Sequence, residues 1–130
     1  MTYVSKCANI TNMKRQVEFY KTQEGKCPVT EFLDSLPGRV VKKITWVLSL
    51  VEDLEIIPTK YYKKLKGTDS IYECRIDMDG NTYRILGFFY GQDFIILTNG
   101  FMKKTKKTPK TEIQIAERRK NEYVEKGGKV

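Results

Sequence analysis

The sequence predicts an α+β fold, in which a small antiparallel sheet carries an N-terminal helical hairpin on one face. Two observations predict it. In the first half of the chain, apolar residues recur at three- and four-residue steps, which is typical of amphipathic helices. In the second half, segments rich in β-branched and aromatic residues are separated by short turn sequences, which is typical of hairpins. The expected order of elements is β-α-α-β-β-β-α, and 130 residues suit a single domain.

The first half is expected to contain one strand and two helices. The alternation of Gln16 to Tyr20 predicts a short first strand. Pro28 suits the first turn of a helix that Pro37-Gly38 ends. A longer helix is predicted from Arg39 to about Glu55, because its apolar residues share one face. We expect Trp46 at the edge of the core that this face forms.

The second half is expected to contain a three-stranded meander and a final helix. Asp79-Gly80 and Gly91-Gln92 are good two-residue hairpin turns. Thr108 is expected to cap a helix that starts with Pro109 and runs to about Glu125. The predicted strands are Ile71–Met78, Thr82–Tyr90 and Phe94–Met102.

The domain is expected to span residues 16–126. Residues 1–15 show no periodicity and are interpreted as a flexible N-terminal lead, and residues 127–130 as a flexible tail. The N-terminus has no apolar block of the signal-peptide type, and no apolar run approaches the ~20 residues of a membrane helix. We therefore expect a cytoplasmic protein without a membrane partner.

The composition excludes several kinds of site. The chain has no histidine, which excludes Ser-His-Asp and Cys-His catalysis and histidine-ligated zinc. Its three cysteines, Cys7, Cys27 and Cys74, are an odd number without CxxC spacing, so we expect reduced thiols with Cys74 in the core. No metal site and no cofactor are expected. Any chemistry must come from lysine, arginine, tyrosine or carboxylates.

The positive charge is concentrated in the second half. The net charge is +8, and residues 60–130 carry 16 of the 24 basic side chains. Such a one-sided field attracts polyanions, so nucleic acid is the first candidate partner. A merely soluble basic surface, or an acidic protein partner, remains open. The two basic clusters are Lys60, Lys63, Lys64 and Lys66, and Lys103, Lys104, Lys106, Lys107 and Lys110.

A turn at Asp79-Gly80 places Arg75 directly opposite Arg84 on one face of the sheet. Like charges in this position destabilise a sheet unless something compensates, so we expect replacement of Arg84 to leave the fold intact. An anion held between the two guanidinium groups is one explanation. A salt-bridge ladder with Glu73 and Asp77, which share the face, is the other.

A turn at Gly91-Gln92 places Arg84 opposite Asn99, which brings both arginines close to Lys103 and Lys104. A groove with these four cations could bind phosphate and stabilise charge during phosphoryl chemistry. Further along the same face lie apolar residues that need a cover, either the last helix or a partner protein. They are Leu86, Phe88, Ile95 and Leu97.

Four segments, in order, resemble a known family. They are FYKTQEGKCPVTEFLDSLPGRVVKKITWVLSLVEDL, KKLKGTDSIYECRI, GNTYRILGFF and NGFMKKTKKTPKTEI. Together they resemble the phage-derived host-inhibition (HigB-like) branch of the RelE/ParE superfamily, the toxins of type II toxin–antitoxin pairs. The resemblance covers roughly residues 16–125 and implies a RelE-like fold.

The resemblance implies a growth-inhibiting, ribosome-dependent endoribonuclease, an mRNA interferase. Such enzymes cleave translated mRNA without metal, through attack of the ribose 2′-OH on the adjacent phosphate, using lysines and arginines. By position, Arg75, Arg84 and Lys103 or Lys104 fall on the family's basic site residues. Two departures are that Glu73 stands where the family has a further basic residue, and that no tyrosine closely follows Lys104.

The resemblance also implies roles and partners. Arg84, with Arg75, would stabilise the charge on the reacting phosphate, and Lys103 or Lys104 would be the acid or base. The expected partners are a cognate helix-turn-helix antitoxin, the ribosome with its mRNA, and operator DNA through the antitoxin. The alternatives are a non-enzymatic ParE-like gyrase inhibitor and an RNA-binding member without cleavage activity. The remaining lysines expected to hold RNA are Lys63, Lys64, Lys66, Lys106 and Lys107.

Overall fold

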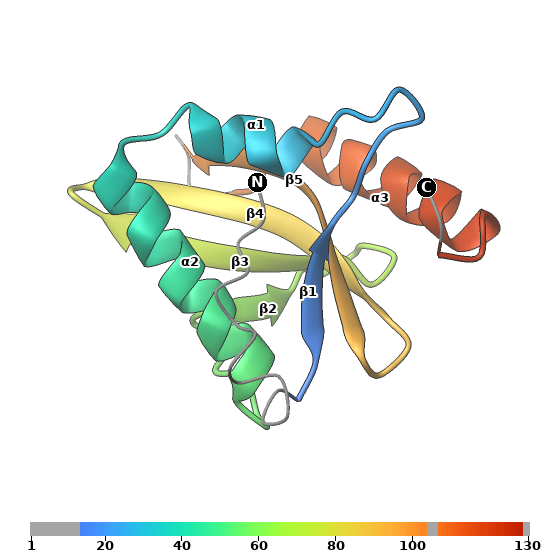
Figure 1. The fold of residues 1–130 in the computed structure, drawn as a ribbon, viewed down its shortest axis with the longest axis horizontal. Helices are drawn as coiled ribbons and strands as arrows, with labels where there is room; N and C mark the ends of the chain where they lie inside the picture. The colour runs from blue at the N-terminus through green and yellow to red at the C-terminus, as the bar shows by residue number, and fades with distance from the viewer. Residues whose placement is uncertain (1–13, 104–106, 129–130) are drawn as a thin grey trace.

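The computed structural model describes residues 14–103 and 107–128, which form a five-stranded sheet with helices on both faces (Figure 1). The predicted α+β class and the predicted elements are confirmed. One strand, β2, was not predicted. The elements are β1 (Gln16–Phe19), α1 (Pro28–Asp34), α2 (Gly38–Asp53), β2 (Tyr62–Lys64), β3 (Tyr72–Met78), β4 (Asn81–Tyr90), β5 (Phe94–Lys103) and α3 (Lys110–Glu125).

The strands lie in the order β1-β5-β4-β3-β2. The β2, β3, β4 and β5 strands pair antiparallel, whereas β1 runs parallel to β5 at the edge of the sheet. The helical hairpin makes this parallel pairing possible, because it returns the chain across the sheet between β1 and the meander.

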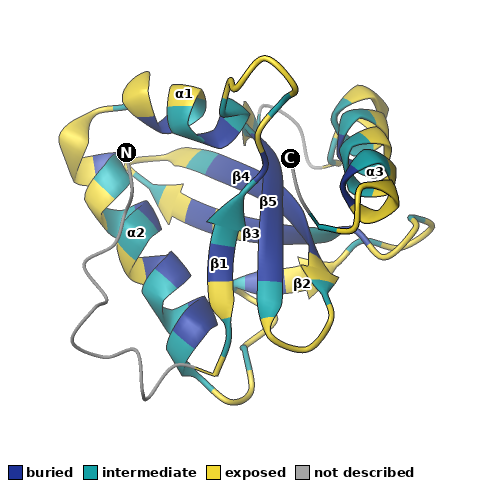
Figure 2. Cartoon of the chain, turned by 45° about the vertical axis from the view of Figure 1, so that its right-hand side comes forward, coloured by how far each residue is buried: buried dark blue, intermediate teal, exposed yellow. Residues whose placement is uncertain are grey.

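The helical hairpin of α1 and α2 covers one face of the sheet and forms the main core. Ile44, Val47 and Leu48 of α2 are almost fully buried, as the three- and four-residue spacing requires. They pack in one cluster with sheet residues that include Ile76 and Ile85. Figure 2 shows the buried side of α2 turned toward the sheet.

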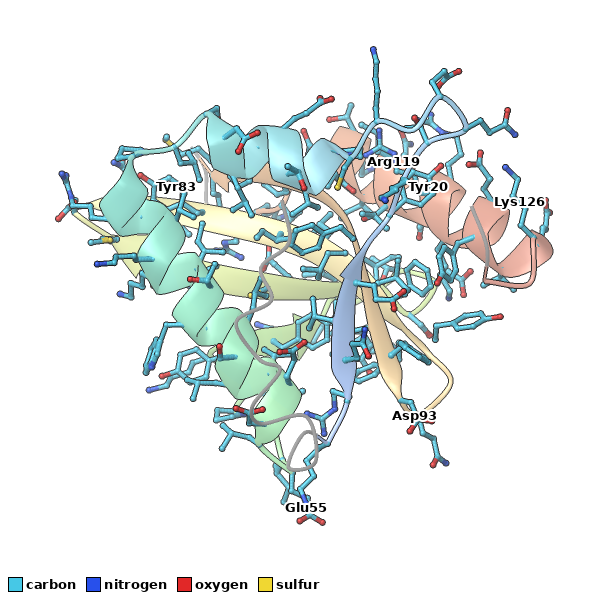
Figure 3. All side chains as sticks on the ribbon, viewed as in Figure 1. Tyr20, Glu55, Tyr83, Asp93, Arg119 and Lys126 are labelled. Atoms are coloured by element: carbon cyan, nitrogen blue, oxygen red, sulfur yellow. The ribbon has the colours of Figure 1, made fainter. Side chains whose placement is uncertain are left out.

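The last helix, α3, packs on the opposite face, so the sheet lies between α2 and α3 (Figure 2). Ala116 packs with Leu86, and Tyr123 packs with Phe88. Near the end of β1, Tyr20 and Arg119 lie against each other, with the guanidinium carbon 5.5 Å from the ring centroid (Figure 3).

The turn between β4 and β5 differs from the prediction. Tyr90 pairs with Phe94, so three residues form the turn instead of two, and a bulge between Leu86 and Gly87 shifts the register again. A bulge adds one residue to one strand and therefore changes every partner beyond it. The prediction that Arg84 lies opposite Asn99 is wrong, because Arg84 pairs with Phe101.

The three-residue turn separates the four apolar residues that were expected to share a face, because it pairs Phe88 with Ile96 instead of Ile95. Leu86 and Phe88 lie under α3, but Ile95 and Leu97 belong to the core under α1 and α2. The last helix covers the first pair, as one of the two expectations proposed. The expectation of a single apolar strip is wrong.

Both ends of the described chain make defined contacts. Of the expected lead, the structure describes Lys14 and Arg15, and the Arg15 guanidinium donates a hydrogen bond to the Leu54 carbonyl at 2.8 Å. At the other end, the Gly128 amide donates to the Tyr123 carbonyl of α3. Residues 1–13 and 129–130 lie outside the described residues.

The expected cap of the last helix is wrong. The Thr108 side chain makes no capping hydrogen bond, and Pro109 is the residue that precedes the first helical turn. The Thr108 hydroxyl instead donates to Glu73 of β3 at 2.5 Å. The start of α3 is therefore tied to the sheet through a carboxylate on the face that carries the arginines.

Candidate active site

A groove of about 720 Å³ opens where β2 ends along the edge of β3. β2 pairs only with residues 72–74, so in the described part of the chain no strand covers the second half of β3 on that side. Side chains from α2, from the segment before β2 and from both faces of β3 therefore reach one opening. The lining residues are Lys43, Trp46, Val47, Thr59, Lys60, Tyr61, Lys63, Glu73, Arg75, Ile76, Asp77 and Arg84.

The predicted opposition of Arg75 and Arg84 is confirmed. Both charges are compensated by carboxylates of the same face. Arg84 forms a buried ion pair with Glu73, and Arg75 pairs with Asp77 at 3.0 Å in an exposed position. The structure thus contains the salt-bridge ladder, one of the two explanations for this register. An anion between the arginines stays a prediction.

The ion pair between Arg84 and Glu73 changes the expected cost of replacing Arg84. Both side chains are less than a tenth exposed, and Glu73 also accepts the hydrogen bond from Thr108. Removing one partner of a buried pair leaves the other charge uncompensated, which strongly destabilises a protein. Relief of repulsion with Arg75 is therefore the smaller effect, and a single Arg84 substitution threatens the fold.

Arg84 is held by one end of its guanidinium and retains an unused donor. Its Nε is buried and has no hydrogen-bond partner, while Glu73 accepts from Nη1. A buried unsatisfied donor costs free energy, so a strand position that keeps one is a candidate for ligand contact. Arg84 also lines the groove, so an acceptor of a ligand has access to this region.

Lys103 lies at the end of β5, opposite Thr82 and two residues along β4 from Arg84. Its amine is partly buried among cations. Burial first, and then the Arg84 guanidinium, lower the pKa of Lys103 below the ordinary 10.5, although Glu73 acts in the opposite direction. Arg75 and Lys63 lower this pKa further. The expected approach of the β5 end to the two arginines is confirmed for Lys103.

The sequence profile described as "Phage derived protein Gp49-like (DUF891)" matches residues 31–121, which contain every residue of the groove and Lys103. The chain belongs to this Gp49-like family. The family is one of RelE-like toxins from toxin–antitoxin systems, which confirms the coarser part of the resemblance. A comparison with curated proteins found no match.

The structure of the Gp49-like chain brings only some of the predicted RNA-binding lysines together. Lys63 pairs with Glu73 across β2 and β3 and shares the face of the arginines. Lys64, the next residue along the strand, points to the other face, and Lys66 lies in the turn that follows. Lys107 is exposed before α3. Lys104 and Lys106 lie outside the described residues.

Sequence reasoning missed the contribution of α2 to the groove. Lys43 and Trp46 are one helical turn apart, and Trp46 is 52% exposed where the edge of the core was expected. Tyr61 joins them from the segment before β2. The sequence feature that could have indicated this contribution is a tryptophan on the solvent-exposed side of an otherwise regular amphipathic helix.

The Gp49-like chain offers little for metal binding in the described ranges. Within them, no group of three or more histidine, cysteine, aspartate or glutamate side chains is placed to hold an ion. Cys74 is fully buried, as predicted, and burial raises the pKa of its thiol to about 12. No helix of residues 14–103 and 107–128 is long and apolar enough to cross a membrane.

Proposed function

We propose that this Gp49-like toxin is a HigB-like, ribosome-dependent endoribonuclease that cleaves translated mRNA. The observation that supports it is the gathering of Lys63, Arg75, Arg84 and Lys103 on one sheet face, within the segment that matches the family. Lys63, Arg75 and Arg84 line the groove and Lys103 lies on the same sheet face, so the site attracts the negative phosphates of RNA. The cytoplasm, where ribosomes work, is the proposed place of action.

The reaction needs one bond to form and one to break. The ribose 2′-oxygen loses its proton and attacks the adjacent phosphorus, and the 5′-oxygen of the next nucleotide leaves and takes up a proton. The products are a 2′,3′-cyclic phosphate and a 5′-hydroxyl end. Because negative charge grows on the phosphate oxygens, fixed cations that point at them lower the barrier. No metal is needed for these steps.

Arg84 is the proposed electrostatic catalyst, with Arg75 as a second donor. Glu73 fixes the Arg84 guanidinium on a central strand, so little reorganisation is needed when the phosphate binds. Arg75 is half exposed, and its weaker pair with Asp77 can exchange for a phosphate oxygen. In this role Glu73 is a positioning residue, and it replaces the basic residue that the family resemblance implies.

Lys103 is the proposed proton carrier. An amine with an ordinary pKa is almost entirely protonated near neutral pH and makes a poor base. The partial burial and neighbouring cations that lower the pKa of Lys103 increase its neutral fraction. Lys104, the other residue considered for this role, stays a prediction.

A toxin of this family has an antitoxin partner. We propose that the partner is a helix-turn-helix protein that covers the groove and brings the pair to operator DNA. Expression of the toxin alone should then arrest growth, and co-expression with the antitoxin should restore it. Normal growth with abundant folded toxin and no antitoxin would contradict the proposal.

A second candidate is an RNA-binding protein without cleavage activity. The observation that favours it is the ion pair of Arg84 with Glu73, which neutralises part of the charge that catalysis would use. A ParE-like gyrase inhibitor is the remaining alternative from the sequence. The experiment below separates all three.

The test combines purified ribosomes, a translated mRNA and mapping of new 5′ ends. The proposal expects cuts within ribosome-bound mRNA, intact free mRNA and unaffected supercoiling by gyrase. Retention of mRNA without cuts would favour the RNA-binding protein, and blocked supercoiling with intact mRNA would favour the gyrase inhibitor. Either result would contradict cleavage.

The matched variant removes both charges of the buried pair. Glu73→Gln with Arg84→Met leaves no uncompensated buried charge, so the fold should survive while cleavage falls by about 10²- to 10³-fold. Arg39→Met is the control, because it breaks an exposed ion pair with Asp79 outside the groove. Equal cleavage by the double variant and the wild type would show that Arg84 is structural.

A further inference from the structure

Trp46 is more exposed than a residue that only packs against the core would be. It lies in the middle of α2, yet about half of its surface is exposed, while its neighbour Val47 is buried. A large exposed apolar ring loses the free energy that burial would provide, unless a ligand covers it. Trp46 lines the groove described above, on the side away from Arg84.

The groove holds the ring beside a second aromatic residue and a cation. Trp46 and Tyr61 meet edge to face, with ring centroids 6.1 Å apart and planes at 87°. The Lys60 ammonium lies 4.9 Å from the centroid of the Tyr61 ring. An edge-to-face contact leaves the faces of the edge-on ring uncovered by its partner, so an aromatic surface stays open for stacking.

The position of this aromatic pair relative to the basic residues is fixed by the backbone. The Tyr61 carbonyl accepts a hydrogen bond from the Arg75 amide at 3.2 Å. On the other side, the Lys43 ammonium donates to the Asp77 carbonyl of β3 at 2.5 Å. The helix, the segment before β2 and the strand edge therefore form one continuous wall, which joins the rings to the arginines.

The chemistry of this wall fits a nucleotide. Flat rings bind any base through stacking, and the nearby cations bind the phosphates that link the bases. A purely apolar peptide would offer no acceptor to the ammonium groups of Lys60 and Lys63. A double helix hides its bases from such a ring, so the matching polyanion is single-stranded.

We propose that Trp46, held edge to face by Tyr61, is a stacking platform for one base of single-stranded RNA, whose phosphates are held by Lys63 and Arg75. The choice of RNA as the polyanion rests on the proposed function. The platform and the pair of Arg84 and Lys103 lie on opposite sides of the β3 edge. The platform therefore binds a nucleotide next to the one that reacts. It contributes affinity and position without entering the reaction.

Fluorescence provides a direct test, because Trp46 is the only tryptophan of the chain. A short oligouridylate should quench its emission in a saturable way, whereas inorganic polyphosphate and polyglutamate should compete for the cations with little quenching. Equal quenching by polyphosphate would show that charge alone accounts for binding. Equal quenching by polyglutamate would point to an acidic protein segment. Either outcome would overturn the proposal.

Substitutions separate stacking from folding. Trp46→Ala should weaken oligouridylate binding by roughly 5- to 150-fold, the range expected for one stacked base, whereas Trp46→Phe should recover most of it. Ile56→Ala is the control, since this residue is 84% exposed and lies outside the groove lining. Unchanged affinity in a folded Trp46→Ala protein would overturn the platform.

The result can be distinguished from failure of the proposed function. Quenching in the wild type and weaker RNA binding by Trp46→Ala, without any cleavage of ribosome-bound mRNA, would support the stacking platform and contradict the endonuclease. Cleavage by the wild-type protein together with unchanged RNA affinity of Trp46→Ala would support the endonuclease and contradict the stacking platform.

Discussion

The two faces of the sheet are built differently. Under α1 and α2 the central sheet side chains are apolar and almost fully buried, as with Ile76 and Ile85. Under and beside α3, polar side chains of the sheet are buried too, among them Glu73, Arg84 and Asn99. They are held by an ion pair and by hydrogen bonds, including one of 2.9 Å from Asn99 to Glu112 of α3.

The difference teaches where stability and chemistry reside in a small toxin. Apolar burial stabilises the sheet face under α1 and α2, which we call the hairpin face. This stabilisation does not depend on the exact position of any single atom. The α3 face keeps the charges of Glu73 and Arg84 out of water, and each charge is compensated by the other. We therefore expect substitutions on the two faces to differ in the property they change as well as in size.

The largest effect is expected from Lys103→Met, which acts on function alone. Loss of the proposed proton carrier should lower mRNA cleavage by about 10²- to 10⁴-fold while RNA binding changes little. Lys64→Met is the matched control, because Lys64 points to the other face. Similar losses in both variants would mean that Lys103 serves only as a phosphate clamp.

The pH profile sharpens the same prediction. Because the pKa of Lys103 is lowered, cleavage should rise with pH and level off below the ordinary lysine value of 10.5. Lys103→Arg should remove this limb, since arginine stays protonated. A limb that persists in Lys103→Arg would assign the proton transfer to another group.

The second effect concerns the stability of the α3 face. Glu73→Ala leaves Arg84 buried without its carboxylate, and the free energy of unfolding should fall by about 3–5 kcal/mol. Denaturation in urea measures it. The double variant Glu73→Gln with Arg84→Met should recover most of the loss. Asp77→Ala breaks the exposed ion pair with Arg75 and is the comparison. If Glu73→Ala lowers the free energy of unfolding by less than Asp77→Ala does, the buried pair does not contribute to stability.

The third effect tests packing on the hairpin face. A Cβ at Gly100 of β5 would collide with the Phe32 ring of α1, so Gly100→Ala should lower the free energy of unfolding by about 1–3 kcal/mol. Gly38→Ala, at the open start of α2, should be neutral or slightly stabilising. Thermal melts of both proteins would show the contrast, and an equal melting temperature would contradict it.

The smallest effect is a pH-dependent one at the rim of the charged face. Partial burial alone would raise the pKa of Asp77, but hydrogen bonds from Thr82 and Arg75 lower it below the ordinary 3.8. The ionised group thus stabilises the fold above that value, and the contribution disappears as the pH falls through the lowered pKa. Because the side chain is exposed, Asp77→Asn should cost at most about 1 kcal/mol near neutral pH and nothing in stronger acid.

The sequence predicted the parts that follow from local patterns. The spacing of apolar residues predicted the buried face of α2, and Asp79-Gly80 predicted the pairing of Arg75 with Arg84. Position 79 adopts a positive φ of 54°, which aspartate tolerates better than most residues. These signals need no knowledge of distant contacts.

The parts that failed depend on tertiary contacts. The three-residue turn after Tyr90 and the bulge at Leu86 and Gly87 each shift the register by one residue, and together they move the partner of Arg84 from Asn99 to Phe101. β2 has only three residues and is defined by its pairing with β3. A salt-bridge ladder and an anion site require the same residues in the same places, so only coordinates could reveal the pair of Arg84 with Glu73.

The parallel pairing of β1 with β5 also sets when the domain can assemble during synthesis. β1 is made early, but Gln16 lies beside Phe94, so the strand waits for most of the chain before it can pair. Joining such distant segments costs loop entropy that the new contacts must offset. Lys103 belongs to the same late strand. A nascent chain that stops before residues 94–103 therefore carries Arg75 and Arg84 but cannot complete the sheet face of the proposed active site.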